Sequence, residues 1–177
     1  FSQMEALRDS GELNVRQILS INCEKTDEQL NNMVERFNKD SDDMINFGGL
    51  KIMIDGVGST YNASMLQPYV DTDNCGPEVY YSVDQLSQYI QKAARHDLVT
   101  HFHVCGDKAV RTALDAYQNA ADKGVKLNKG FSIDHCDTTA AAYVARPAKL
   151  GISCNLTPDF LAATETWETN PYMMVYD

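Results

Sequence analysis

Short apolar runs alternate along the chain with longer stretches in which apolar residues recur at helical spacing. The apolar runs predict five strands, at residues 13–21, 48–56, 98–105, 130–137 and 152–157. The periodic stretches predict helices at residues 26–37, 82–95, 107–123 and 140–149, and the first residues of the chain also have a helical pattern. Thr26 and Ser82 are the expected N-caps of the first two of these helices. Pro147 lies inside the last predicted helix, where we expect a kink. Regular alternation of strands and helices is typical of parallel strands joined by crossover helices, which is an α/β fold.

Five such strands fit either an open, doubly wound sheet or five of the eight strands of a barrel. A dinucleotide-binding sheet would carry a glycine-rich turn between its first strand and helix, but Gly56-Val-Gly58 lacks the third glycine and enters a loop. A flavodoxin-like binding domain needs a similar glycine-rich loop, and we find none. Residues 57–80 have no sustained period and predict a long loop, which inside a compact domain is usually functional.

Composition and charge narrow the possible functions. The 177 residues carry a formal net charge of −10, which argues against nucleic-acid binding because few Lys and Arg side chains remain to neutralise phosphates. No apolar run approaches the ~20 residues that span a bilayer, so we expect no membrane segment. The five cysteines form no CxxC pair, which favours free thiols in a reducing compartment such as the cytoplasm. Both ends suggest that residues 1–177 are one segment cut from a longer protein.

Charged side chains interrupt the second predicted strand. Strand alternation directs Leu50, Ile52 and Ile54 to one face and Lys51, Met53 and Asp55 to the other. A parallel strand covered on both sides should be almost wholly apolar. Lys51 and Asp55 therefore form either a buried ion pair or part of a functional site.

Histidines cluster near the ends of the next two strands. Alternation places His101, His103 and Cys105 on one face of the third strand, and it places Ile133, His135 and Asp137 on one face of the fourth. Neutral imidazole is the commonest metal ligand in proteins, and sites in parallel α/β folds gather at the carboxyl ends of strands. The pattern therefore predicts a metal site. A zinc site that includes Cys105 is an alternative, and we expect Asp137 to cap the helix that begins near residue 140.

Four blocks of the chain resemble, in the same order, blocks of the YtcJ-like amidohydrolases, which are metal-dependent hydrolases that include N-substituted formamide deformylases. The first block, Gly-Leu-Lys51-Ile-Met-Ile-Asp55-Gly56-Val with Asn62-Ala63 and Pro68-Tyr69, is similar to their K…DG…TA…PY pattern. The others are His103-Val-Cys-Gly-Asp107-Lys-Ala, Ile133-Asp134-His135, and Leu150-Gly-Ile with Thr157-Pro158. Asp134 stands where the family has Glu and Thr157 where it has Gln.

The resemblance implies a fold and a set of site residues. The fold would be a partial (β/α)8 TIM barrel, about strands 3 to 7. Lys51, which carbon dioxide can carboxylate, would bind one or two divalent ions, such as zinc, together with His103 and His135. Asp107 would orient a ligand histidine, while His101 and Asp55 would contact substrate or metal, internal hydrogen bonding being the alternative for both. No general base lies within the chain, since the family's catalytic Asp is expected downstream and its first-strand His-x-His pair upstream.

The implied activity is hydrolysis of a non-peptide C–N bond in a small amide by a metal-activated water. These 177 residues alone would be an incomplete catalyst. The alternative is a non-catalytic fragment or a degenerate paralogue that serves as a structural or interaction domain. Five strands of an eight-stranded barrel leave two open edges, so we expect the chain to form homo-oligomers or to add a strand from a partner.

Overall fold

A single parallel sheet organises the protein, whose computed structural model describes residues 2–38, 44–69 and 72–157. Within these residues the sheet has the order β1-β2-β3-β4-β5, and every neighbouring pair is parallel. The strands are β1 (Gln17–Asn22), β2 (Ile45–Met53), β3 (Val99–Val104), β4 (Ser132–His135) and β5 (Ser153–Leu156). A doubly wound sheet reverses its strand order at one point, whereas this order is sequential throughout, as it is in a barrel. The predicted α/β class with crossover helices is confirmed.

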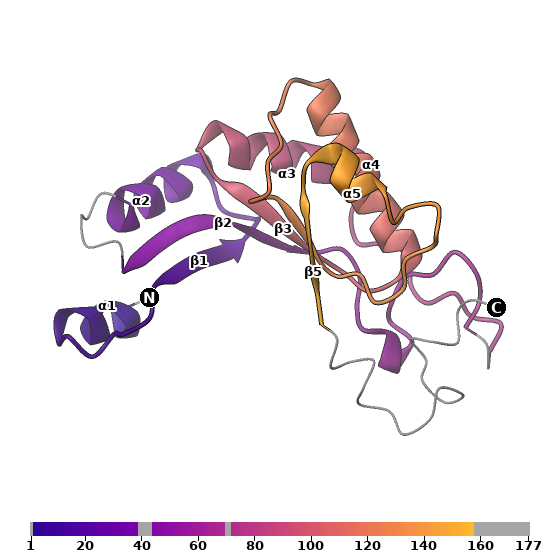
Figure 1. The fold of residues 1–177 in the computed structure, drawn as a ribbon, viewed down its shortest axis with the longest axis horizontal. Helices are drawn as coiled ribbons and strands as arrows, with labels where there is room; N and C mark the ends of the chain where they lie inside the picture. Colours follow the sequence, from indigo (N-terminus) through magenta and orange to yellow (C-terminus); the bar gives the residue numbers. More distant parts are fainter. Residues whose placement is uncertain (1, 39–43, 70–71, 158–177) are drawn as a thin grey trace.

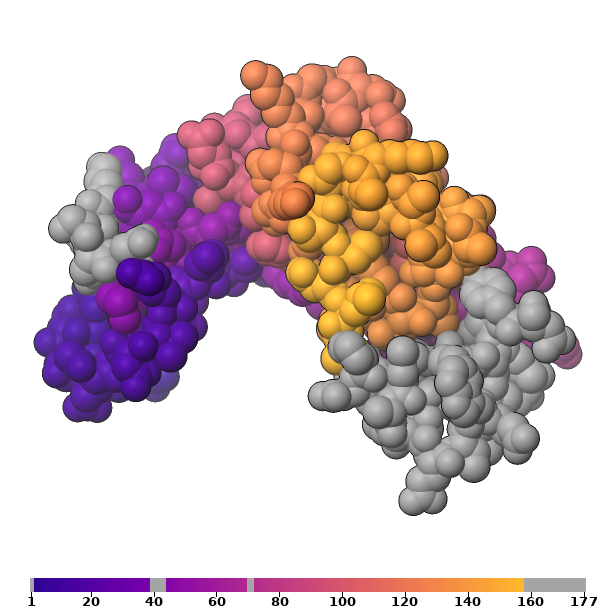
Figure 2. Space-filling model, viewed as in Figure 1, coloured from indigo at the N-terminus to yellow at the C-terminus, as the bar shows by residue number. Residues whose placement is uncertain are grey.

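The helices that the structure describes cover one side of the curved sheet and leave the other side open. The described helices are α1 (Ser2–Asp9), α2 (Asp27–Phe37), α3 (Val83–Arg95), α4 (Asp107–Asp122), α5 (Arg146–Leu150) and a 3-10 turn, η1 (Gly58–Thr60). Figure 1 shows α2 to α5 along the convex side, and Figure 2 shows the resulting arch with its hollow on the opposite side. Capping boxes start two of the helices as the sequence predicts, with Thr26 before α2 and Ser82 before α3.

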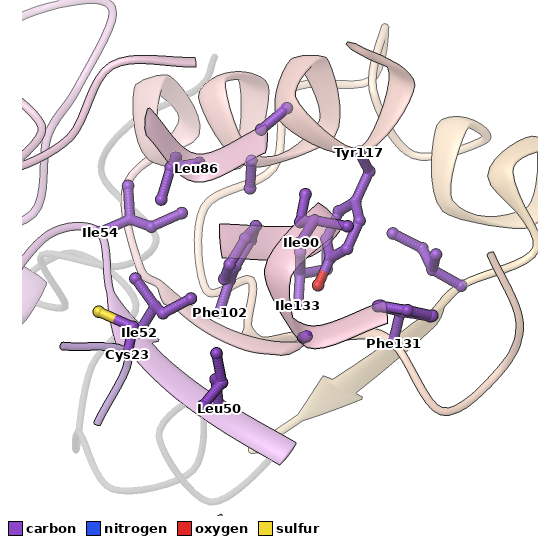
Figure 3. Close-up of a cluster of buried hydrophobic side chains, with 14 of the residues drawn as sticks. Cys23, Leu50, Ile52, Ile54, Leu86, Ile90, Phe102, Tyr117, Phe131 and Ile133 are labelled. Carbon is purple, nitrogen blue, oxygen red and sulfur yellow. The ribbon is translucent and has the colours of Figure 1, made fainter. Parts of the chain in front are cut away.

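The hydrophobic core lies between the sheet and these helices (Figure 3). Leu50, Ile52 and Ile54 are almost fully buried there, as their alternation predicts. Tyr117 from α4 reaches the sheet, and its hydroxyl lies 3.0 Å from both the Thr100 and the Ser132 carbonyl oxygens. This phenol therefore ties α4 to β3 and β4 while its ring fills the core.

The second strand begins earlier than predicted because Gly48 and Gly49 lie inside it. The pairing of β1 with β2 shifts register between Leu19 and Ser20, which leaves Gly48 as an extra residue in β2. A Cβ atom at Gly48 would lie 2.6 Å from Ile18 Cγ2. Glycine at this position therefore permits a bulge and a close strand contact, and it does not mark the start of the strand.

The fourth strand ends at His135 through an abrupt change in backbone conformation. His135 and Cys136 have φ values of 78° and 52°, in the left-handed region that strands exclude. Ile133 packs in the core, whereas the His135 ring contacts the His103 ring on the opposite side of the sheet. The prediction that Ile133 and His135 share a face was therefore wrong, because the left-handed residues break the alternation.

The predicted helix at 140–149 is also shorter in the structure. Turns occupy residues 141–145, and α5 starts only at Arg146 with Pro147 in its first turn. Proline is tolerated there because its missing N–H would have no partner within the helix. Pro147 therefore starts the helix and does not kink it.

Candidate metal centre

A polar network crosses the open face of the sheet between β2 and β5. Lys51 on β2 forms an ion pair with Asp134 on β4. The Asp134 carboxylate also accepts hydrogen bonds at 2.8 Å from Ser132 Oγ and Asn155 Nδ2. Burial acts to raise the pKa of Asp134, but the hydrogen bonds from Lys51, Asn155 and Ser132 together hold it below its ordinary value. The Lys51 ammonium therefore has a charged partner, which is Asp134 and not Asp55.

His101 belongs to this network. Its Nδ1 lies 2.9 Å from Ser132 Oγ. Because the Ser132 hydroxyl donates to Asp134, His101 Nδ1 carries hydrogen and donates to Ser132 Oγ. Burial lowers the pKa of His101. The neutral ring thus keeps its lone pair on Nε2.

His103 and His135 come together at the carboxyl ends of β3 and β4. Their ring centroids are 4.6 Å apart in an edge-to-face arrangement. Burial, together with the nearby His135 and Lys51, lowers the pKa of His103 to about 4. Nδ1 of His135 lies 3.1 Å from Thr157 Oγ1. His103 is therefore neutral at pH 7, the state in which imidazole binds a metal ion.

Asp55 points into a pocket of backbone N–H groups. Its Oδ1 accepts from Cys105 N at 3.0 Å, and its Oδ2 accepts from Ser64 N and Gly106 N at 3.0 and 2.8 Å. Burial raises the pKa of Asp55 to about 6, against the opposing effect of these bonds. The described contacts correspond to the internal hydrogen-bonding alternative, and a substrate or metal role for Asp55 stays a prediction.

Asp107 also holds the loop of residues 57–80 against the sheet. It is buried at the start of α4, and its Oδ1 accepts from Leu66 N at 2.8 Å. Ser64 Oγ donates to the Pro77 carbonyl at 2.7 Å, and the Tyr69 hydroxyl donates to the Ala63 carbonyl at 2.8 Å. The loop is thus docked above the carboxyl ends of β2 and β3. An orienting role of Asp107 toward a ligand histidine stays a prediction.

A second group of potential ligands surrounds Cys105, which follows β3. Ligand atoms of Asp55, His103 and Cys105 all lie within 4.8 Å of one another, and all three residues are buried. Burial raises the pKa of the Cys105 thiol, and the nearby carboxylates of Asp137 and Asp55 raise it further. Asp137 does not cap a helix near residue 140, because α5 begins at Arg146 and has Ala145 at its N-cap. Its Oδ2 is buried and has no hydrogen-bond partner among the described residues.

The donor types at this end of the sheet, together with the neutral state of His103, fit a divalent metal ion. The part of the chain that the structure describes provides two imidazoles, a thiol and carboxylates here, which are the ligands that zinc takes in proteins. A hollow of about 550 Å³ borders Leu98, Val125 and Phe131, at the amino ends of β3 and β4. That hollow is remote from the histidines, and in parallel α/β barrels sites form at the carboxyl ends of strands.

Comparisons with known proteins agree with this picture. A model of the amidohydrolase family matches residues 1–174. Over 115 residues, 64% of this chain and 20% of the relative, the chain is 32% identical to "Protein LONG AFTER FAR-RED 3" of Arabidopsis thaliana. Over 133 residues, 75% of this chain and 25% of the relative, it is 25% identical to YtcJ of Bacillus subtilis (strain 168), which is named as an amidohydrolase. The chain therefore spans about a fifth to a quarter of these curated relatives.

Two solved structures share the fold. Uncharacterized metal-dependent hydrolases from Pyrococcus furiosus and Pyrococcus horikoshii OT3 match with TM-scores of 0.76 and 0.74, at 23% and 20% identity. The matches cover 96% and 92% of this chain and 34% and 32% of those chains. Among the described residues, no helix combines the length and apolar character needed to cross a membrane. The family match over nearly the whole chain, together with the sequential parallel sheet, shows that the protein belongs to the amidohydrolase family.

Proposed function

We propose that the chain is the central part of a metal-dependent hydrolase that cleaves C–N bonds of small, non-peptide amides. Lys51, His103 and His135 would hold one or two divalent ions, zinc being the expected metal. The observation that carries the proposal is the pair of histidine rings 4.6 Å apart at the carboxyl ends of adjacent strands, with His103 neutral. The resemblance of the surrounding sequence blocks to amidohydrolases supports the same ligands.

Each side chain would contribute in a distinct way. His103 offers a neutral nitrogen donor, and His135 offers a second imidazole beside it. His101 donates through Ser132 to the carboxylate that pairs with Lys51. Carboxylation of Lys51 would convert its ammonium to an anion and release Asp134 from the ion pair. The chemistry that a bound divalent ion supplies is a lower pKa for its water ligand and polarisation of the amide carbonyl. The general-base aspartate is expected in the part of the protein after residue 177.

The docked loop would form one wall of the substrate site. Tyr61 and Tyr69 stack edge to face with centroids 5.1 Å apart, and Tyr61 is 39% exposed. An exposed aromatic edge at the carboxyl end of the sheet suits an uncharged small amide better than a nucleic acid. We also place the protein in the reducing cytoplasm, because all five cysteines are free thiols.

Zinc stoichiometry tests the proposal. The purified 177-residue chain would be dialysed against buffered zinc and measured by elemental mass spectrometry, beside His135→Ala and the control His96→Ala. His96 binds Asn31 and Asp27 on the helical side, away from the site. We expect close to one zinc per chain in the wild type and in His96→Ala, and a clear loss in His135→Ala. Equal zinc in all three proteins, or none in any, would contradict the proposal for this chain.

A structural or interaction domain without catalysis is the second candidate. The observation in its favour is the complete Lys51–Asp134–Ser132–Asn155 network, which satisfies the lysine without a metal ion. Carboxylation of Lys51 distinguishes the hydrolase from the structural domain. If Lys51 leaves this network and is carboxylated, the intact mass measured under bicarbonate will show one added CO2 on the wild type and none on Lys51→Met. If the network is permanent, neither protein will gain this mass.

A further inference from the structure

Two cysteines, Cys136 and Cys154, both border one residue of β4, Ile133. Cys154 lies on β5 and is the Cα partner of Ile133 in the parallel ladder. Paired residues of neighbouring strands point to the same side of a sheet, and Ile133 points into the core between the sheet and the helices. The Cys154 side chain therefore lies beside Ile133 on the helical side.

The left-handed backbone after β4 brings the second sulfur back to the same residue. His135 and Cys136 have φ values of 78° and 52°, so the chain turns out of the strand at this point. As a result, Cys136 Sγ donates to the Ile133 carbonyl oxygen at 3.8 Å, three residues earlier in the chain. The two thiols thus approach Ile133 from two separate segments.

Both cysteines also line one hollow of about 350 Å³ on the helical side of the sheet. Tyr143, Pro147 and Leu156 contribute to its apolar walls. In the part of the chain that the structure describes, Cys154 is exposed and Cys136 is partly buried, so a small oxidant can reach the Cys154 sulfur from solution. The neighbouring Cys136 thiol lowers the pKa of Cys154, against the effect of its partial burial, and this favours the reactive thiolate.

The other three cysteines are less open to an oxidant. Cys23 and Cys105 are buried, with exposed fractions of 1% and 2%. Cys75 is partly buried and packs against the small apolar cluster that contains Cys105. A bond between Cys75 and Cys105 would have to form beneath the docked loop of residues 57–80, whereas Cys154 faces solution.

We propose that Cys136 and Cys154 are a site of reversible oxidative modification, where hydrogen peroxide joins their sulfurs in an intrachain disulfide. Peroxide first transfers one oxygen atom to the Cys154 sulfur, which gives a sulfenic acid and one water. The Cys136 thiol then attacks that sulfur, its S–O bond breaks, and a second water leaves. In total the two thiols lose two hydrogens and two electrons, and one peroxide becomes two waters. A dithiol reductant reverses the change by thiol–disulfide exchange.

This disulfide would fasten the segment of residues 137–153, which contains α5, at both of its ends. It would also hold the end of β4 in its left-handed conformation, because Cys136 directly follows His135. In a reducing compartment such a bond is transient and typical of redox sensing. The inference does not depend on the proposed hydrolase function, since neither sulfur is among the proposed metal ligands.

Peptide mapping after peroxide treatment tests the site. The reduced, metal-free 177-residue chain would receive peroxide in small molar steps, then N-ethylmaleimide to block the remaining thiols, and then trypsin. Trypsin cleaves after Lys149, between the two cysteines, so a disulfide links two peptides that otherwise separate. We expect this linked pair, an intact mass lower by two hydrogens, and recovery of the original mass with dithiothreitol.

Substitutions identify the two sulfurs and the order of the steps. Cys136→Ser and Cys154→Ser should each abolish the linked pair, whereas the control Cys75→Ser should keep it. Dimedone added with peroxide should label Cys154 in Cys136→Ser, because its sulfenic acid then meets no second thiol. A Cys75–Cys105 bond, a disulfide between chains, or a treated wild type without linked peptides would overturn the proposal. Circular dichroism checks the fold of each variant, and Cys136→Ala and Cys154→Ala replace any serine variant that unfolds.

Discussion

His101 and His103 lie two residues apart on the same face of β3, yet their surroundings differ. His101 lies beside Lys51 and Ser132 in the paired strands and donates to a hydroxyl. His103, two residues further along the strand, faces the ring of His135. The difference arises because the left-handed backbone at His135 brings its ring across to His103. Two histidines that alternation makes equivalent therefore have different roles in the proposed site.

The ion pair between Lys51 and Asp134 should be measurable as a coupling energy. Both side chains are partly exposed, so we expect Asp134→Asn to lower the free energy of unfolding by about 1–2 kcal/mol. The effect should be much smaller in a Lys51→Met background, because the mutation then removes no charged partner. Urea unfolding of the two single variants and the double variant gives the coupling. Additive effects of the two substitutions would contradict the pairing.

The buried His103 ring predicts a pH-dependent stability in metal-free buffer. Its pKa in the folded state is about 4, below the roughly 6.5 of an exposed histidine, so the unfolded chain binds more protons between these values. The contribution of His103 is therefore fully present above pH 6.5 and is lost as pH falls toward 4. We expect the difference in unfolding free energy between wild type and His103→Gln to rise by about 2 kcal/mol from pH 4 to pH 7.

Asp55 has the opposite effect on the free energy of unfolding, over nearly the same pH range. Its raised pKa of about 6 means that the folded chain binds the extra proton, so its contribution destabilises the fold as pH rises from about 4 through 6. The free energy of unfolding of the wild type should thus vary less with pH than either His103 or Asp55 alone predicts. Comparison with His103→Gln cancels the contribution of Asp55, and a difference independent of pH would show that His103 is not held neutral.

At the scale of elements, the loop of residues 57–80 depends on how closely its backbone approaches the start of α4. A Cβ atom at Gly106 would lie 2.0 Å from the Ser64 carbonyl oxygen. Asp55 then ties Ser64 N and Gly106 N to one carboxylate. The missing side chain at Gly106 and the buried carboxylate of Asp55 together hold this loop in place, although η1 is the only helix or strand among its described residues.

Gly106→Ala should therefore displace the loop. Because backbone atoms and not a flexible side chain occupy the position, we expect a loss of about 3 kcal/mol in unfolding free energy and faster proteolysis within residues 57–80. Gly124→Ala is the matched control: nothing lies within 4 Å of its Cβ position, and only its φ of +93° opposes the substitution. That control should cost about 1 kcal/mol and leave the loop protected. Equal proteolysis of both variants would count against the docking role of Gly106.

At the scale of the whole molecule, the arch exposes a face that a closed barrel would bury (Figure 2). Ile18 on the edge strand β1 is 74% exposed, and Met53 at the end of β2 is 47% exposed. β1 and β5 are the two edges of the described sheet, and each presents unpaired backbone groups. The 177-residue chain on its own should therefore associate with itself.

Sedimentation velocity over a range of concentrations tests this expectation. We expect the wild type to show concentration-dependent association, and Ile18→Lys to shift it toward monomer because a charge on the edge strand opposes strand addition. Val144→Lys replaces a residue that is 64% exposed in the turns before α5 and should leave association unchanged. A wild-type chain that is monomeric at every concentration would refute the expectation.

The spacing of apolar residues alone was sufficient to predict most of the helices and strands. α2 and α3 begin after the expected caps, Thr26 and Ser82, because capping chemistry is local. The errors fall where contacts distant in sequence decide the backbone. Gly48 is a bulge because Ile18 lies against it, and β4 stops early at two left-handed residues. Pro147 starts a helix where local reasoning predicted a kink.

The amino-acid sequence by itself determined the strand–helix alternation, the buried face of Leu50, Ile52 and Ile54, and the position of His103 and His135 near strand ends. These features depend on side-chain period and chain order. Only the tertiary structure decided that Lys51 pairs with Asp134 and that Asp55 binds backbone N–H groups. The physical reason is that these contacts join residues on different strands, so they depend on sheet register and backbone conformation, which local sequence patterns do not specify.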